Sequence, residues 1–330
     1  MIGKAARYID EITANEALNA AKDDSDRRRI RATIMHLNCL ARFRSMNSEK
    51  ETSKLMDCLK NGKLFFSTSG GYNDPYDTLM YIDKEALCEN VARTIVSSMP
   101  EYLESTKHEA PLKYEFASRI MSLTEYQKAD FLNGFLSNLS TFTEEVKAEI
   151  KEKSKSICFS KDFLTLLLWS HYADSHRGVA LLYDIKELEN AKCFDRNGNP
   201  VDGTFKLHNI VYSAERPDAT SLLGDLFLYK KSKIASFPED AFRTVMLTKD
   251  ATWEYEEEVR LLPDILDLES QSKYCYLNIF PKAIILGTMF PKEKIADMVV
   301  LSKEIGCVLY ETWINEEQRD YKIVFQEMNI

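Results

Sequence analysis

Short apolar runs typical of β-strands occur in two parts of this chain, and residues 84–156 separate them with little strand signal. That intervening stretch carries segments with helical character, broken near Pro100 and Pro111. Strands grouped together, with helices grouped between them, are typical of α+β proteins rather than of doubly wound α/β sheets. The pattern therefore predicts an α+β fold with a mixed or largely antiparallel sheet core and a helical insertion.

Three regions follow from this pattern. Residues 1–36 are predicted to be an N-terminal helical segment, residues 37–83 and 157–330 the α+β core domain, and residues 84–156 the helical insertion. The strands predicted for the core are residues 40–44, 63–67, 157–160, 179–183, 206–212, 259–262, 274–279, 283–286, 308–313 and 322–326. Helices are predicted at residues 50–60, 84–97, 125–139, 143–155, 217–247 and 291–304.

The overall charge limits the class of partner. The chain has 330 residues, of which 43 are basic and 52 acidic, giving a net charge of −9. A general nucleic-acid binder needs a basic surface to neutralise phosphates, so that class is disfavoured, although a small basic pocket is compatible with the composition. The seven cysteines are scattered without a C-x-x-C pair and are expected to be free thiols.

The chain is expected to be cytoplasmic. No run of apolar residues approaches the length needed to cross a bilayer, so no transmembrane helix is predicted. The first ten residues also lack the apolar core of a signal peptide.

One polar cluster, residues 169–178, precedes the predicted strand at 179–183. His171 is a candidate catalytic or ligand-orienting group, because histidine can transfer a proton near neutral pH. Two other interpretations stay open: a metal site of the form H-x-x-D-x-H, and a structural role for His171 in satisfying buried polar groups. On a helix, His176 does not align well with His171 and Asp174, so no metal is expected.

A second cluster is the acidic segment at residues 253–260. If it is a strand, Glu254, Glu256, Glu258 and Arg260 share one face. Two neighbouring carboxylates can push one pKa upward while an arginine keeps the other ionised, which suits acid/base chemistry or stabilisation of an oxocarbenium-like state. The alternative is an edge strand with a solvated acidic face.

A third cluster, Asn73-Asp74-Pro75, has the composition of a turn. Asp74 and Asp77 can also reach a ligand from such a loop. The chain has no G-x-G-x-x-G opening a helix, no Walker A motif and no G-x-S-x-G elbow, so these three familiar site types have no support.

Together the segments resemble a widespread bacterial family, domain-of-unknown-function family 2971. The resemblance covers about residues 37–310. Its parts are the arginine-containing strand at 40–45, Phe66-Ser67 with the N-D-P-aromatic-acidic loop at 73–77, the W-x-H-Y-A-x-x-H-x-G segment at 169–178, and W-x-x-E-x-E-x-R at 253–260. Residues 211–217 and 283–287 match more loosely.

The order of an arginine strand, a strand ending in serine and a late E-x-E is also similar to the layout of ADP-ribosyltransferases, which cleave the nicotinamide–ribose bond of NAD. This fold-level analogy implies that Arg44 or Arg42 anchors the dinucleotide, Ser67 supports it, and Glu258 or Glu256 is catalytic. It implies NAD as cofactor, a nucleotide-type ligand, a protein or nucleic-acid acceptor, and a bacterial toxin or phage-defence setting.

The expected site is therefore a set of catalytic and binding side chains without metal ligands. These are Glu258, Glu256 and His171 for catalysis, and Arg44, Arg42, Ser67, Asn73, Asp74, Tyr172, Trp169 and Arg260 for cofactor binding.

Two other functions stay open. The first is a metal-dependent nuclease, whose ligands come from Asp74, His171, Asp174, His176 and Glu258. The second is a non-catalytic sensor that uses the helical insertion as a partner surface. Packed Trp169 and Trp253 that leave no cavity favour the sensor.

Overall fold

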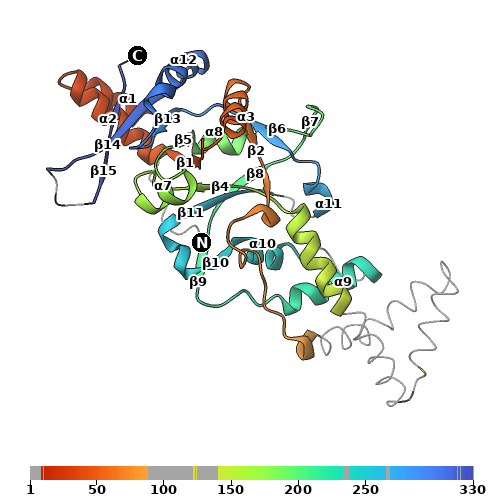
Figure 1. Cartoon of the computed structure of the whole chain (residues 1–330). Helices are drawn as coiled ribbons and strands as arrows, with labels where there is room; N and C mark the ends of the chain where they lie inside the picture. The colour runs from red at the N-terminus through yellow and green to blue at the C-terminus, as the bar shows by residue number, and fades with distance from the viewer. Residues whose placement is uncertain are drawn as a thin grey trace.

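Figure 1 shows the chain as a computed structural model. The structure describes residues 9, 11–87, 122, 124, 140–232, 238–264, 268–317, 319 and 321–329. The helices predicted at 125–139 and over most of 84–97 lie outside these residues. A helix at residues 140–153 agrees with the one predicted at 143–155.

The core is a nine-stranded sheet in the order β15-β14-β13-β5-β1-β4-β11-β8, with β3 paired to β4. Strands β13 and β14 are parallel, and the other pairs of this sheet are antiparallel. The mixed, mostly antiparallel sheet confirms the predicted α+β fold. The strands are β1 (Cys39–Arg44), β3 (Ser67–Thr68), β4 (Lys155–Ser160), β5 (Val179–Asp184), β8 (Phe205–Asn209), β11 (Glu258–Pro263), β13 (Ala283–Leu286), β14 (Val308–Ile314) and β15 (Ile323–Glu327).

Two smaller sheets flank the core. One has the order β2-β12-β6-β7, from β2 (Lys63–Phe65), β12 (Tyr276–Asn278), β6 (Lys192–Phe194) and β7 (Pro200–Val201). The other is a parallel pair of β9 (Val211–Ser213) and β10 (Thr248–Asp250). The strand predicted at 206–212 is thus divided between β8 and β9, in two different sheets.

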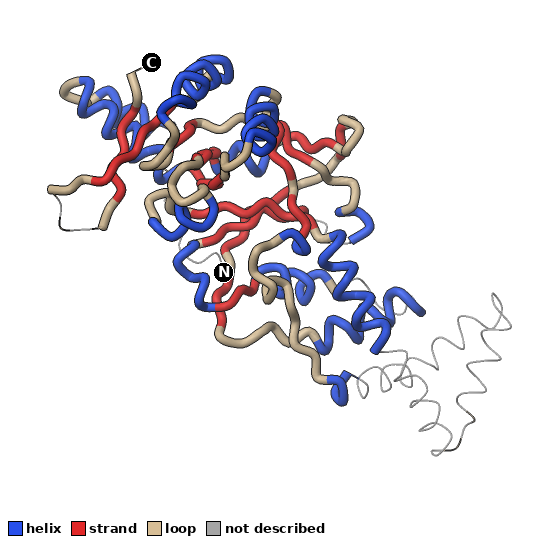
Figure 2. The backbone as a smooth tube through the Cα atoms, viewed as in Figure 1, coloured by secondary structure: helices blue, strands red, loops and turns tan. Residues whose placement is uncertain are grey.

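Helices surround the strands (Figure 2). They are α1 (Glu11–Asn19), α2 (Asp24–Asn38), α3 (Glu49–Lys60), α7 (Leu166–Tyr172), α8 (Ile185–Asn190), α9 (Thr220–Ser232), α10 (Glu239–Leu247), α11 (Leu268–Gln271) and α12 (Ile295–Ile305). The described residues also form the short 3-10 helices η1 (Ser69–Gly71), η2 (Ala251–Glu256) and η3 (Lys292–Lys294). Figure 1 shows α9 far from α1 and α2, with strands of the main sheet between them.

The central strands are buried on both faces. Successive side chains of a strand point to opposite faces, so Leu40 of β1 packs into one core with Leu181 and Ile284. Its neighbour Ala41 belongs to a second core on the other face, which also contains Trp169. A third core joins α9 and α10 to the end of β11.

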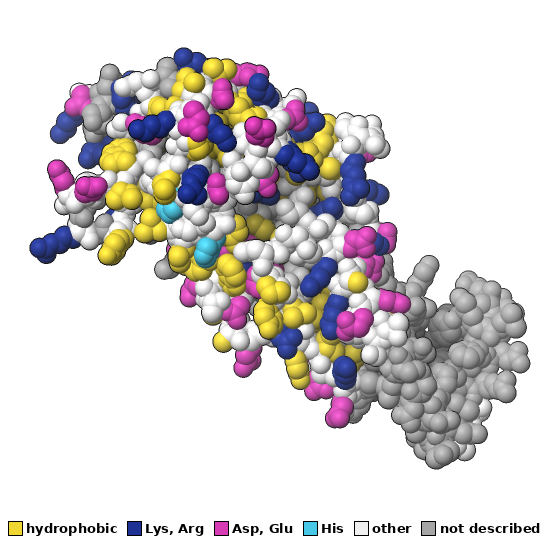
Figure 3. Space-filling view, in the orientation of Figure 1, with side chains coloured by type: hydrophobic (Ala, Val, Ile, Leu, Met, Phe, Trp, Pro, Cys, Tyr) yellow, Lys and Arg dark blue, Asp and Glu magenta, His cyan; other side chains and the backbone are white. Residues whose placement is uncertain are grey.

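Basic and acidic side chains are interspersed over the face seen in Figure 3. This distribution agrees with the modest excess of acidic residues in the sequence. Within the described residues, no helix is long and apolar enough to cross a membrane.

Candidate functional site

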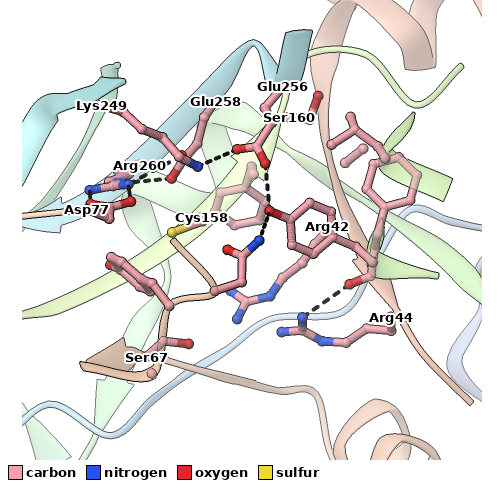
Figure 4. A pocket seen from close by; sticks show the side chains of 18 residues that line it. Arg42, Arg44, Ser67, Asp77, Cys158, Ser160, Lys249, Glu256, Glu258 and Arg260 are labelled. Atoms are coloured by element: carbon pink, nitrogen blue, oxygen red, sulfur yellow. Dashed lines mark hydrogen bonds and ion pairs between the residues drawn. The ribbon is translucent and has the colours of Figure 1, made fainter. Parts of the chain in front are cut away.

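A cavity of about 350 Å³ opens where β1, β4 and β11 lie side by side in the main sheet. Side chains from these strands, from β3 and the loop after it, from the end of α7 and from β10 and η2 line it. Ligand sites are typically clefts of about this size or larger. Figure 4 shows the cavity from close by.

Two arginines of β1 form one wall. Arg42 and Arg44 are two positions apart on the strand, so both side chains point to the same face. Arg42 is 7% exposed, and its Nη1 atom has no hydrogen-bond partner among the described residues. Burial lowers the pKa of Arg42, and burial together with the charge of Arg42 lowers the pKa of Arg44 to about 9. Within the described chain, neither guanidinium is paired with a carboxylate.

A bridge of opposite charges forms another wall (Figure 4). The Nζ atom of Lys249 lies 2.6 Å from Glu256 Oε2 and 3.0 Å from Glu258 Oε2. All three side chains are at most 6% exposed. Burial alone lowers the pKa of Lys249, but the carboxylates of Glu258 and Glu256 outweigh it and raise the pKa.

Arg260 extends this row of charges into the protein. Its Nε atom donates to Glu258 Oε1 at 2.7 Å, and its Nη1 atom donates to Asp77 Oδ1 at 3.0 Å and to the Met246 carbonyl at 2.7 Å. Burial alone raises the pKa of Glu258, but Arg260 and Lys249 outweigh it and lower the pKa to about 2. Glu258 is therefore ionised at neutral pH.

Tyr172 and Asn73 connect the acidic wall to the cavity mouth. The Tyr172 hydroxyl donates to Glu256 Oε1 at 2.6 Å and accepts a hydrogen bond from Asn73 Nδ2 at 2.8 Å. Burial and the neighbouring Glu256 raise the pKa of Tyr172, so the hydroxyl remains a donor at neutral pH.

The acidic segment is a strand only in its second half, where β11 contains the strand predicted at 259–262. Residues 251–256 form η2, whose first turn begins with Asp250 accepting a hydrogen bond from the Thr252 amide at 2.9 Å. Glu257 then adopts a left-handed conformation with φ 43°, and β11 starts at Glu258. Glu254 is consequently exposed and shares no strand face with Glu258.

Three residues predicted at the site lie elsewhere. Trp169 is fully buried in the core and donates from Nε1 to the Phe163 carbonyl at 2.7 Å. His171 is exposed outside the cavity, with Nδ1 2.9 Å from the Tyr255 hydroxyl. Asp74 uses Oδ1 to accept from the Tyr76 amide at 2.9 Å, which is the turn role that its sequence context favours.

The other eight predicted residues do line the cavity: Arg42, Arg44, Ser67, Asn73, Tyr172, Glu256, Glu258 and Arg260. Asp77, which the sequence offered as a ligand contact from the N-D-P-aromatic-acidic loop, also lines the cavity and accepts a hydrogen bond from Arg260. Sequence reasoning missed Lys249. Lys249 follows the predicted helix at 217–247, and nothing local distinguishes it from a surface lysine.

A left-handed turn holds α7 in place. Asp174, Ser175 and His176 have φ values of 50°, 50° and 67°. Such conformations are costly for residues other than glycine. After them comes Gly178, where an added Cβ would lie 2.1 Å from the carbonyl oxygen of Arg44. The glycine of the family motif thus permits the turn to pack directly against β1.

Among the residues that the structure describes, no group of three or more His, Cys, Asp or Glu side chains is arranged to hold a metal ion. His176 Nε2 instead lies 3.2 Å from Ser170 Oγ. The Cys158 thiol lines the cavity, and burial and Glu258 raise its pKa to about 11, so it is protonated at neutral pH.

Comparison with known families supports the resemblance drawn from the motifs. Residues 168–261 match the family described as "Protein of unknown function (DUF2971)". The matched stretch runs from within α7 into β11 and includes Lys249 and Glu258. No curated protein and no solved structure matches the chain.

Proposed function

We propose that the cavity binds a phosphate-bearing nucleotide, with NAD as the leading candidate, and that the protein cleaves its nicotinamide–ribose bond in an ADP-ribosyltransferase-like manner. One observation carries the proposal. Arg42 and Arg44 of β1, Ser67 of β3 and Glu258 of β11 are far apart in the chain but line the same cavity.

The arginine wall suits the phosphates of such a ligand. A buried charge without a partner is unfavourable, so an anionic group between Arg42 and Arg44 relieves a cost already present in the protein. A guanidinium group can also donate two parallel hydrogen bonds to a phosphate group, which fixes the orientation of the ligand.

The acidic wall suits the developing positive charge. With a pKa of about 2, Glu258 is a poor proton acceptor but a permanent negative charge in a buried site. Its proposed role is therefore to stabilise an oxocarbenium-like ribose, directly or through a ribose hydroxyl, with Glu256 beside it. His171 has no part in this step, because it lies outside the cavity.

The reaction proposed is a transfer. The bond between ribose C1 and the nicotinamide nitrogen breaks, and its electron pair leaves with nicotinamide, which becomes neutral. A nucleophile of the acceptor, from a protein or a nucleic acid, then bonds to C1 and releases its proton to solvent. A bacterial toxin or phage-defence effector is the proposed setting.

Calorimetric titration tests the ligand part of this proposal. NAD is compared with nicotinamide riboside, which has the same glycosidic bond but no phosphate. Wild type is expected to bind NAD about tenfold or more tightly than the riboside. Arg44→Gln should lose most of that difference, whereas Arg216→Gln, an exposed arginine, should keep it. Equal binding of both ligands by wild type would contradict the proposal.

The two alternative functions gain no specific support. The ligands named for a nuclease do not converge among the described residues. A pocket filled by Trp169 and Trp253 would support the sensor, but Trp169 is buried in the core and a cavity of about 350 Å³ remains.

A further inference from the structure

We propose that Lys249 is a positioning residue that holds the carboxylates of Glu256 and Glu258 together on one ammonium group and so sets the charge of this wall of the cavity. The inference deepens the proposed function and rests on it for its consequence. Its structural basis is the geometry of β10, which sequence reasoning did not single out.

Lys249 is placed by two independent connections. In the parallel pair of β9 and β10, Lys249 lies opposite Tyr212. The Tyr212 hydroxyl accepts a hydrogen bond of 2.8 Å from the backbone N–H of Glu258. The small β9–β10 sheet is therefore tied to the first residue of β11, and this connection fixes the distance between Lys249 and Glu258.

The two carboxylates account for most of the interactions of the Lys249 ammonium group. Two of its three donors are used by Glu256 and Glu258, and the group lies 4.8 Å from the ring centroid of Trp253, within range of a cation–π contact. The side chain is 4% exposed, so water does not screen these interactions as it screens a surface pair. Lys249 thus joins the two carboxylates through one ammonium group.

The two carboxylates depend on Lys249 to different degrees. Glu258 also bonds Arg260, which in turn bonds Asp77. Among the described residues, Glu256 has Lys249 as its cationic partner, with the Tyr172 hydroxyl as its other donor. Removing Lys249 therefore leaves two buried carboxylates, one of them without a cation. Under those conditions, like charges in proximity favour uptake of a proton by the pair.

Other ionisable groups also face Lys249 and its two carboxylates, and their titration must be distinguished from that of the carboxylate pair. They are Arg260 and Asp77, the hydroxyls of Tyr172, Tyr212 and Tyr255, and the thiol of Cys158. Burial raises the pKa values of the three tyrosines and of the cysteine, so these four groups stay neutral between pH 5 and 9. A new titration in that range belongs to the carboxylate pair.

The test compares Lys249→Met with Lys249→Arg, and uses Lys161→Met as the matched control because Lys161 is exposed. Carbon-13 NMR of the glutamate carboxyl groups is recorded against pH, with signals assigned through Glu256→Gln and Glu258→Gln. Wild type, Lys249→Arg and Lys161→Met are expected to show no titration of either carboxylate between about pH 5 and 9. Lys249→Met should show one. A folded Lys249→Met protein that titrates like wild type would overturn the inference.

A double variant covers the case in which Lys249→Met does not fold well. Glu256→Gln added to Lys249→Met removes the carboxylate that lost its cation, so the double variant should melt at a higher temperature than the single one. No recovery would count against the inference. Both readouts are independent of NAD cleavage. If wild type does not release nicotinamide, the proposed function fails while the role of Lys249 still stands or falls on these two measurements.

Discussion

The hydroxyl of Tyr172, at the last residue of α7, donates a hydrogen bond of 2.6 Å to Glu256, at the last residue of η2. Asn73 donates to the same hydroxyl from the loop after η1. Three segments distant in sequence therefore meet at one oxygen atom, and α7 is connected directly to the carboxylate pair.

Replacing Tyr172 with Phe tests this connection. The variant leaves Glu256 Oε1 without its donor in a buried site, which typically costs about 1–3 kcal/mol. We expect NAD affinity in calorimetric titration to fall about tenfold. Tyr255→Phe removes a similar hydroxyl that bonds His171 outside the cavity, and it should bind NAD as wild type does. Equal losses in both variants would mean that the hydroxyl of Tyr172 has no special role.

The low pKa of Glu258 predicts how the stability of the folded protein changes in acid. Its pKa is about 2 in the folded protein against a usual value of 4.5, so the unfolded chain binds the proton more readily. The stabilisation is complete above about pH 4.5 and is lost as pH falls towards 2, with a total of ~3 kcal/mol. Denaturant unfolding of wild type and Glu258→Gln at several pH values measures it. The slope between pH 4.5 and 2 should be shallower in the variant, and an unchanged slope would contradict the assignment.

We expect Arg42 to lower the stability of the ligand-free protein and to contribute to binding of an anionic ligand. Arg42→Met removes a buried charge that has no hydrogen bond at Nη1, so the ligand-free variant should melt no lower than wild type. Added pyrophosphate should raise the melting temperature of wild type but not of the variant. Scanning calorimetry with and without pyrophosphate measures the melting temperature of each empty protein and its increase on adding pyrophosphate. A variant that melts lower when empty, yet keeps the full pyrophosphate response, would refute the anion site.

The left-handed turn at residues 174–176 predicts that a glycine there stabilises the protein. Ser175 has φ 50°, where glycine is not penalised, so Ser175→Gly should raise the free energy of unfolding by ~1 kcal/mol. Ser53→Gly is the matched control, since Ser53 is exposed within α3, and it should lower that free energy by about 0.5–1 kcal/mol. Denaturant unfolding decides the matter. Destabilisation by both substitutions would show that the Ser175 side chain matters more than its backbone conformation.

The parts of the fold that depend on local pattern were predictable. Strands β5 and β13 are apolar runs that are buried on both faces, β1 alternates apolar residues with Arg42 and Arg44, and α3 ends at Lys60, two residues before Gly62. Their hydrophobic periodicity and their turn residues are visible without tertiary information.

The acidic segment shows where local pattern fails. Alternating Glu residues at 254, 256 and 258 fit a strand, but the Asp250 cap begins a 3-10 turn that ends only at Glu257. The carboxylates of Glu256 and Glu258 still come together, because Glu257 between them adopts a left-handed conformation and not because the residues alternate along a strand. The role of Lys249 could not be predicted, because it depends on the pairing of β10 with β9 from far earlier in the chain.

Trp169 and His171 illustrate a second limit. Their motif contains polar and aromatic groups that look like a binding site, yet Trp169 and His176 stack within the fold at a ring separation of 6.2 Å. A single sequence does not reveal which face of α7 is turned inward. Of this motif, Tyr172 is the residue that reaches the cavity through a side-chain bond to Glu256.

The central claim is that Glu258 supports cleavage of the nicotinamide–ribose bond. The most direct test is nicotinamide release from NAD, followed by chromatography, with cell lysate and nucleic acid offered as acceptors. Wild type is compared with Glu258→Gln and with Glu254→Gln, an exposed glutamate on the same segment. We predict release by wild type and Glu254→Gln, and a loss of about a hundredfold or more in Glu258→Gln. Release that is equal in all three proteins, or absent from wild type with every acceptor, would contradict the claim.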